Sequence, residues 1–165
     1  MTVSKITEVR QYLTFKLEQE VFALDVGKVR EILDYTNIAK VPQTPEFMRG
    51  VINLRGSVVP VVDMRLKFNM SAQVRTVDTC IIVVEIMIDS EATILGALVD
   101  SVQEVFELEP SQVEPAPRIG TKLNTDFILG MGKRDEQFVI ILDIDKVFSS
   151  EELEIVSNMG SDAAA

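Results

Sequence analysis

The stretch that decides the fold is residues 22–32, FALDVGKVREI, because it occurs twice in the chain. Residues 95–105 read LGALVDSVQEV, and both copies end in Val-x-Glu followed by Ile or Val. The two copies align without a gap, so that Val26 corresponds to Val99. Self-similarity at a fixed spacing is typical of a duplicated structural unit. The sequence therefore predicts two copies of one fold.

Two more blocks repeat, now at a second and longer spacing. PEFMRGV at 45–51 matches TDFILGM at 125–131, and VVPVVD at 58–63 matches FVIILD at 138–143. The change of spacing indicates an insertion in the second copy, within a stretch that contains Pro110, Pro115 and Pro117. A proline-rich loop is a place where an insertion is tolerated.

Short apolar runs separated by turn residues predict the secondary structure. Residues 12–17 alternate in polarity, and residues 81–88 and 139–142 are apolar runs too short for independent helices. Short strands of this kind are typical of small barrels. We expect a mainly β fold of two five-stranded barrels related by duplication. Helical segments are expected after Asp25, Asp63 and Asp143, around residues 45–48, and over residues 149–158, which begin with a capping signal.

Composition limits the class of protein. The 165 residues are 47% hydrophobic, enough for a real core, and the net charge is −10. Basic residues are scattered, unlike those of a nucleic-acid or anionic-membrane binder. No apolar run approaches the roughly 18 residues that span a bilayer, the first ten residues hold no signal-peptide core, and a single cysteine agrees with a reducing compartment. We expect a soluble intracellular protein without nucleic-acid partners or membrane insertion.

The sequence offers little for catalysis. There is no histidine, so the commonest general base and most zinc sites are missing. Asp143 and Asp145 could hold a cation or act as acid and base, but Asp143 corresponds to Asp63 in the duplication, which favours a helix cap. Cys80 lies in an apolar segment with no activating histidine, which favours a buried, inert thiol. We expect no cofactor, and a carboxylate-based enzyme or metal-dependent sensor at these two aspartates stays open as the alternative.

One loop residue differs from its duplicate. Residues 50–57, GVINLRGS, join two valine-rich strands, and Arg55 precedes a glycine that permits a tight turn. The guanidinium is therefore expected at the surface. The corresponding residue of the second copy is Asp135, so any role of Arg55 belongs to one barrel only. This asymmetry argues against a purely architectural role, although a solvated loop arginine is the simpler alternative.

The string GVINLRG at 50–56, followed by VPVVD at 59–63 and Arg65, closely resembles the core motif of CheW-like domains. VREI at 29–32, PEFMRG at 45–50 and GALVD at 96–100 fall in the order and spacing of that family. The resemblance covers about residues 10–158. It implies one domain made of two Src-homology-3-like barrels that exchange elements. The first would take residues 20–67 and the helix 149–158, and the second residues 68–146, possibly with a strand at 11–17.

The resemblance also implies a function. Family members are non-enzymatic adaptors that bind the regulatory domain of the histidine kinase CheA and the cytoplasmic tip of methyl-accepting chemotaxis receptors. It implies a cytoplasmic protein, monomeric when isolated and recruited to receptor arrays, with an adaptor for a related non-chemotaxis pathway as the alternative. Cys80 and Gly96 also match positions near the groove between the barrels, but a core role is favoured for both. The positions carried over to the partner-binding surface are Arg55, Glu31, Val29, Gly50, Asn53, Val102 and Val105.

Overall fold

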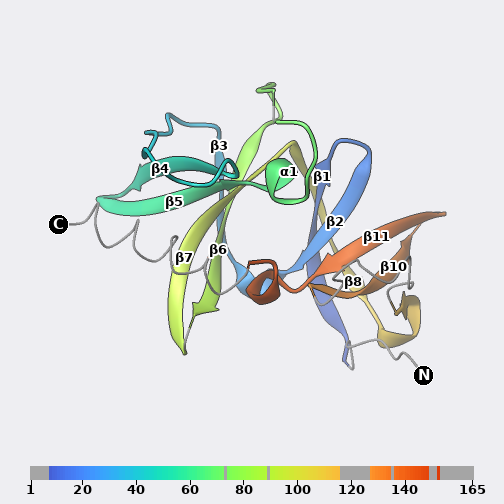
Figure 1. Ribbon diagram of the computed structural model, residues 1–165. Helices are drawn as coiled ribbons and strands as arrows, with labels where there is room; N and C mark the ends of the chain where they lie inside the picture. Colours follow the sequence, from blue (N-terminus) through green and yellow to red (C-terminus); the bar gives the residue numbers. More distant parts are fainter. Residues whose placement is uncertain are drawn as a thin grey trace.

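The computed structural model describes residues 8–72, 74–88, 90–115, 127–134, 136–148 and 152, which form two sheets side by side with α1 near their junction (Figure 1). The predicted mainly β fold is confirmed. Sheet A has the order β8-β1-β2-β11-β10-β9, with β1 (Arg10–Leu17), β2 (Glu20–Asp25), β8 (Ser101–Leu108), β9 (Val113–Glu114), β10 (Ile128–Arg134) and β11 (Gln137–Leu142). Sheet B has the order β3-β6-β7-β5-β4, with β3 (Val29–Asp34), β4 (Met48–Leu54), β5 (Ser57–Asp63), β6 (Cys80–Ile88) and β7 (Glu91–Val99).

Within the described ranges four short helices follow strands: η1 (Val26–Lys28), α1 (Met64–Lys67), η2 (Pro110–Gln112) and, after the last strand, η3 (Ile144–Lys146). The three aspartates expected to begin a helical turn do so, because each carboxylate accepts a backbone N–H two residues ahead and satisfies a donor at the helix start. These bonds are Gly27 N to Asp25 at 2.8 Å, Arg65 N to Asp63 at 3.0 Å and Asp145 N to Asp143 at 3.2 Å.

Two other expected helices have different outcomes. Around residues 45–48 the chain forms a single turn, in which Met48 N donates to the Pro45 carbonyl at 2.9 Å, and no helix follows because β4 begins at Met48. The helix expected over residues 149–158 lies outside the described residues except at Glu152, which is helical. Lys67 of α1 lies 3.3 Å from the Glu152 carboxylate.

The strand registers confirm the duplication residue by residue. Val61 of β5 lies opposite Gly96 of β7 in a parallel pair, and the corresponding residues Ile141 and Ala23 lie opposite each other in the parallel pair of β11 and β2. β3 and β8 both carry a bulge at corresponding positions, as do β4 and β10. β9, the sixth strand of sheet A, comes from the stretch where the change in spacing indicated an insertion.

Each sheet combines strands from both copies. Sheet A takes β1 and β2 from the first copy and β8, β10 and β11 from the second, and sheet B takes the reverse set. The predicted exchange of elements is therefore present. The predicted barrels were divided between residues 67 and 68, and the strand pairing divides them elsewhere. β6 and β7 lie in sheet B with β3–β5, while β2 pairs with β1 in sheet A. Sequence similarity identified equivalent strands, which are not the strands that pair.

A shared core joins the two sheets. The phenyl rings of Phe15, Phe22, Phe68 and Phe127 stack in a column with centroid separations of 5.7, 5.5 and 5.4 Å. The first two rings belong to β1 and β2, whereas Phe68 caps α1 at the end of β5. Each such aromatic pair contributes about 0.5–1.5 kcal/mol beyond the burial of its area. The two barrels therefore pack as one unit.

Candidate partner-binding surface

Arg55 lies in the two-residue turn between β4 and β5. Leu54 pairs with Ser57, and the residues between them have φ values of +49° for Arg55 and +88° for Gly56. Positive φ at both central positions defines a type I′ turn, which matches the twist of a hairpin but disfavours a residue with a Cβ at its first position. Asn53 Oδ1 accepts the Gly56 N–H at 2.8 Å and closes the turn. The turn projects the arginine side chain, 73% exposed, as the sequence predicted.

The guanidinium of Arg55 binds the carboxylate of Glu31 on β3. Nη1 and Nη2 donate to the two carboxylate oxygens at 3.1 and 2.9 Å, the fork geometry that suits a carboxylate. The hydrogen bond from Arg55 lowers the pKa of Glu31, and the same bond raises the pKa of Arg55. Water screens a pair this exposed, so it adds little to stability and mainly orients the guanidinium. Two residues selected separately from the sequence thus form one charged unit on the surface.

The three valines of the expected surface fall into two groups. Val29 on β3 and Val102 on β8 occupy corresponding positions, and both pack against the shared core while partly exposed. Val105 is 51% exposed, and its counterpart Ile32 is 46% exposed. Both exposed side chains lie just beyond the bulge of an edge strand. Each sheet thus presents an apolar side chain at one edge, the kind of position that a partner can cover.

Gly50 has a packing role in the structure. It is buried at φ +141°, and a Cβ built on it would lie 2.0 Å from the Ala39 carbonyl oxygen. Only glycine lets the segment at Ala39 lie against the edge strand β4 as an isolated antiparallel bridge, in which Ala39 and Val51 exchange two backbone hydrogen bonds of 2.9 Å. Gly96 and Cys80 belong to the core, as expected: a Cβ on Gly96 would meet Ile81 Cγ2 at 2.8 Å, and Cys80 is buried, which raises the pKa of its thiol.

The two aspartates considered for metal or acid-base chemistry are bound within the fold. Asp143 caps η3, and Asp145 accepts Lys28 Nζ at 2.7 Å and the Met87 N–H at 3.0 Å. A cation site needs several ligands free to converge on one ion. In the part of the chain that the structure describes, no three His, Cys, Asp or Glu residues are placed to hold a metal ion. The arrangement supports the structural interpretation of both residues.

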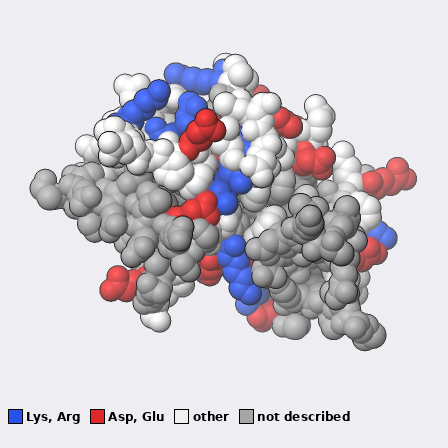
Figure 2. All heavy atoms as spheres, viewed as in Figure 1, with Lys and Arg blue, Asp and Glu red and all other residues white. Residues whose placement is uncertain are grey.

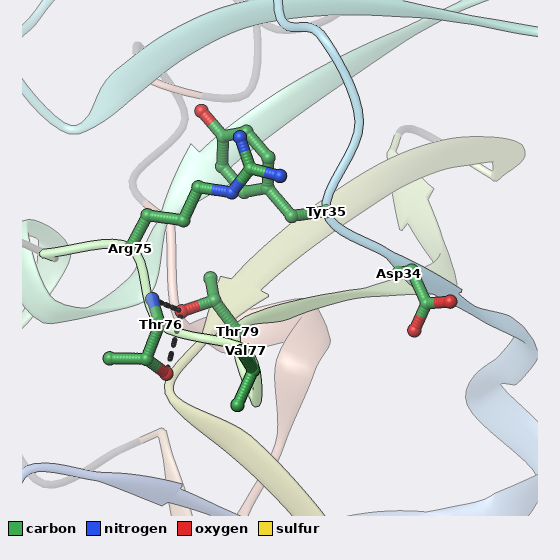
Figure 3. Close-up of a pocket in the computed structure, with 6 residues that line it drawn as sticks. All are labelled: Asp34, Tyr35, Arg75, Thr76, Val77 and Thr79. Carbon is green, nitrogen blue, oxygen red and sulfur yellow. Dashed lines mark hydrogen bonds between the residues drawn. The ribbon is translucent and has the colours of Figure 1, made fainter.

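Sequence reasoning missed a pocket of about 370 Å³ between the end of β3 and the start of β6, drawn in Figure 3. The Arg75 guanidinium lies over the Tyr35 ring, 4.3 Å from the ring centroid. The Asp34 carboxylate points away from this guanidinium. Thr76 N donates to Thr79 Oγ1 at 2.9 Å, which fixes the loop whose neighbouring Val77 is 99% exposed. The groups offer hydrogen bonds and apolar contact, and no nucleophile with a base. Two exposed valines of the loop before β6, Val74 and Val77, were the available sequence signal.

Comparison with known proteins identifies the class of this fold. The family model for the CheW-like domain matches residues 11–152. The chain is 36% identical over 161 residues to the chemotaxis protein CheW of Klebsiella aerogenes, covering 96% of this chain and 95% of that protein. The CheW of Rhizobium meliloti is 31% identical over 145 residues, which cover 88% of this chain and 91% of that protein.

A solved structure agrees with these relatives. The scaffolding protein TtCheW from Thermoanaerobacter tengcongensis superposes with a TM-score of 0.75 at 34% identity, over 87% of this chain and 94% of that one. The chain belongs to the CheW-like domain family. No helix in the described ranges is long and apolar enough to cross a membrane.

Proposed function

We propose that this chain is a non-enzymatic adaptor of bacterial chemotaxis, which couples methyl-accepting chemotaxis receptors to the histidine kinase CheA. Its relatives are chemotaxis proteins CheW, and its structural neighbour is a scaffolding protein. The adaptor would act in the cytoplasm and join receptor arrays by binding the receptor tips. The seven residues carried over from the family resemblance remain the proposed partner surface, with Gly50 acting through the Ala39–Val51 bridge that it permits.

The observation that carries this proposal is the Arg55–Glu31 pair. Positive φ occurs at five other described non-glycine residues, three of them in the β1–β2, β6–β7 and β10–β11 turns, so the orientation of the guanidinium and not the backbone distinguishes Arg55. Here the hairpin holds a mostly exposed arginine in that conformation, and Glu31 fixes its guanidinium. A preoriented arginine beside apolar strand edges is a common centre of protein interfaces.

The mechanism involves no bond making. One surface of the adaptor holds the regulatory domain of the kinase, and another holds the receptor hairpin. A change in receptor geometry then alters kinase activity by changing the relative placement of the bound partners, which is a coupling free energy between two sites. The apolar edges of β3 and β8, on different sheets, supply two separate places for such contacts.

Isothermal titration calorimetry tests the proposal. The purified chain is titrated with the isolated CheA regulatory domain and with a receptor-tip fragment, beside Arg55→Asp and the control Lys133→Asp. Lys133 also forms an exposed ion pair, with Glu114, but on sheet A. We expect saturable binding by the wild type. The affinity should fall roughly tenfold or more in Arg55→Asp, because the centre of the interface is removed, and should be unchanged in the control. Normal binding and kinase control by folded Arg55→Asp would refute the assignment of Arg55.

A further inference from the structure

The chain passes between the two sheets at only two places among the described residues. It leaves sheet A after Asp25, through η1, and enters sheet B at Val29. It returns from β7 to β8 through Asp100. Any change in the angle between the barrels must bend these two crossovers. Figure 2 shows acidic and basic side chains interspersed along the junction between the sheets.

A charged cluster holds the second crossover. Arg65, which follows β5, donates from Nε to Asp100 Oδ1 at 2.7 Å and from Nη2 to Asp100 Oδ2. The same carboxylate accepts the backbone N–H of Glu18, in the β1–β2 hairpin of sheet A, at 2.8 Å. The Arg65 and Asp100 side chains are only 18% and 16% exposed. A bidentate, mostly buried pair with a third hydrogen bond is geometrically well defined.

A second charged cluster holds the first crossover. Lys28, the last residue of η1, binds Asp145 Oδ2 at 2.7 Å, and Asp145 Oδ1 accepts the N–H of Met87 on β6 at 3.0 Å. Asp145 follows sheet A, whereas Met87 lies in sheet B. The Lys28 and Asp145 side chains are 34% and 28% exposed, and among the described residues the ammonium has one ion-pair partner. This cluster is therefore wetter and less constrained than the other.

The duplication relates two of the three positions in each cluster, whereas the crossover residues are offset by one, since Asp100 corresponds to Gly27 and Lys28 to Ser101. Arg65 and Asp145 correspond, because each lies two positions after the aspartate that caps its helix, and they carry opposite signs. β2 and β7 are matched by the duplication, and their registers with β1 and β6 make Glu18 and Met87 equivalent positions. Each of these two residues donates its backbone N–H to the carboxylate of its cluster. The junction between the sheets is therefore held by a charged cluster at two places. In one cluster the helix after β5 supplies the base, Arg65, and in the other the helix after β11 supplies the acid, Asp145.

We propose that these two clusters, Arg65–Asp100–Glu18 and Lys28–Asp145–Met87, are inter-barrel clasps that set the angle between sheets A and B, and that the Lys28–Asp145 clasp is the one that opens. The inference rests on the proposed function in one respect, since an adaptor that places two partners depends on the angle between its two halves. Arg65, Asp100, Lys28 and Asp145 are then positioning residues, which act on the partner surfaces through the barrels. Salt weakens an exposed ion pair more than a buried one, so opening increases with ionic strength.

Residual dipolar couplings of backbone amides, measured by NMR on the full chain, report the relative orientation of the sheets directly. In the wild type at low salt we expect a single alignment tensor to fit both sheets. Lys28→Asp and Asp145→Lys each place like charges together, so we expect the two sheets to require separate tensors. Lys146→Asp is the control, because Lys146 is exposed, adjoins Asp145 and forms no ion pair with a described residue. If a reversed variant fails to fold, Lys28→Met breaks the pair and keeps the aliphatic stem.

The double variant Lys28→Asp with Asp145→Lys decides whether the clasp acts through its charges. It places the acid on the crossover and the base after the last strand of sheet A, the same order of charges as in the Arg65–Asp100 clasp, so we expect the single alignment tensor to return. Single variants that keep the wild-type orientation, or a double variant that does not restore it, would overturn the proposal. In calorimetry we expect the single variants to bind each partner separately with wild-type affinity. In kinase assays we expect the same variants to lose the coupling of receptor to kinase in the ternary complex. A wild type that binds neither partner would refute the proposed function, whereas the NMR comparison would still decide the clasps.

Discussion

Replacing Gly50 with alanine is expected to destabilise the whole domain. The new Cβ would lie 2.0 Å from the Ala39 carbonyl oxygen and 2.7 Å from the carbonyl carbon, and both are backbone atoms that cannot rotate away. The segment at Ala39 must therefore move off β4. That movement breaks the two hydrogen bonds between Ala39 and Val51.

The size of the effect follows from these losses. Each of the two hydrogen bonds contributes about 0.5–1.5 kcal/mol net. Holding alanine at the glycine φ of +141° costs a further 1–3 kcal/mol or so. The expected loss is about 2–6 kcal/mol, a large part of the roughly 5–15 kcal/mol by which domains are stable. Gly50→Ala should therefore be at least partly unfolded at moderate temperature.

Urea denaturation followed by circular dichroism measures this loss. Gly56→Ala is the matched control, since Gly56 also has a positive φ, +88°, but a Cβ there would meet no atom within 4 Å. The control isolates the backbone contribution, and the difference between the variants isolates the clash with Ala39. If Gly50→Ala unfolds at the same urea concentration as Gly56→Ala, the Ala39–Val51 bridge is not rigid and the reasoning is wrong.

Three further results are expected. Tyr12→Phe should stabilise the protein by about 1 kcal/mol in urea denaturation, because the buried Tyr12 hydroxyl has no hydrogen-bond partner among the described residues; destabilisation would show that the hydroxyl is satisfied. Arg55 lowers the pKa of Glu31, so the ion pair should be fully formed above the ordinary carboxyl pKa and should be lost as the pH falls through the lowered pKa. Arg55→Ala should therefore raise the NMR titration midpoint of Glu31. Millimolar Mg²⁺, Ca²⁺ or Zn²⁺ should leave the melting temperature unchanged, because Asp143 and Asp145 already have partners; a metal-dependent rise would revive the metal-site alternative.

The sequence predicted local features well where the chemistry is local. An aspartate before a helical turn and a glycine after Arg55 act within a few residues of themselves, so the caps and the β4–β5 turn follow from short motifs. The duplication predicted equivalent strands because related copies keep equivalent residues. The duplication could not show which copy supplies the neighbour of a given strand. β6 pairs with β3, but β8 is the equivalent of β3 in the second copy and would fit the same sequence pattern. Pairing within and between copies looks the same in the sequence.

The candidate surface was predictable residue by residue but not as an arrangement. Arg55 and Glu31 were selected separately, and their pairing depends on a hairpin tip reaching an edge strand 24 positions away in the chain. Gly50 was assigned to the surface by resemblance, whereas its burial reflects an isolated backbone bridge with no sequence signal at Ala39. Tyr35 and Arg75 were missed because a stacked arginine leaves no periodic pattern. Partner binding by these residues stays a prediction.

The exchange of strands has a consequence for how the chain acquires its fold during synthesis. Sheet B is built entirely from residues 29–99 and can close once β7 has left the ribosome. β1 and β2 are made first, yet β1 pairs with β8 and β2 with β11, so Phe22 waits for Ile140. An isolated hairpin is at best marginally stable, and although the apolar face of β1 and β2 packs in the core shared with sheet B, the outer edges of both strands stay unpaired until almost the whole domain exists. Of the described strands, the first two to be translated are therefore the last to have both edges paired, which makes these edges the natural place for a chaperone to bind the nascent chain.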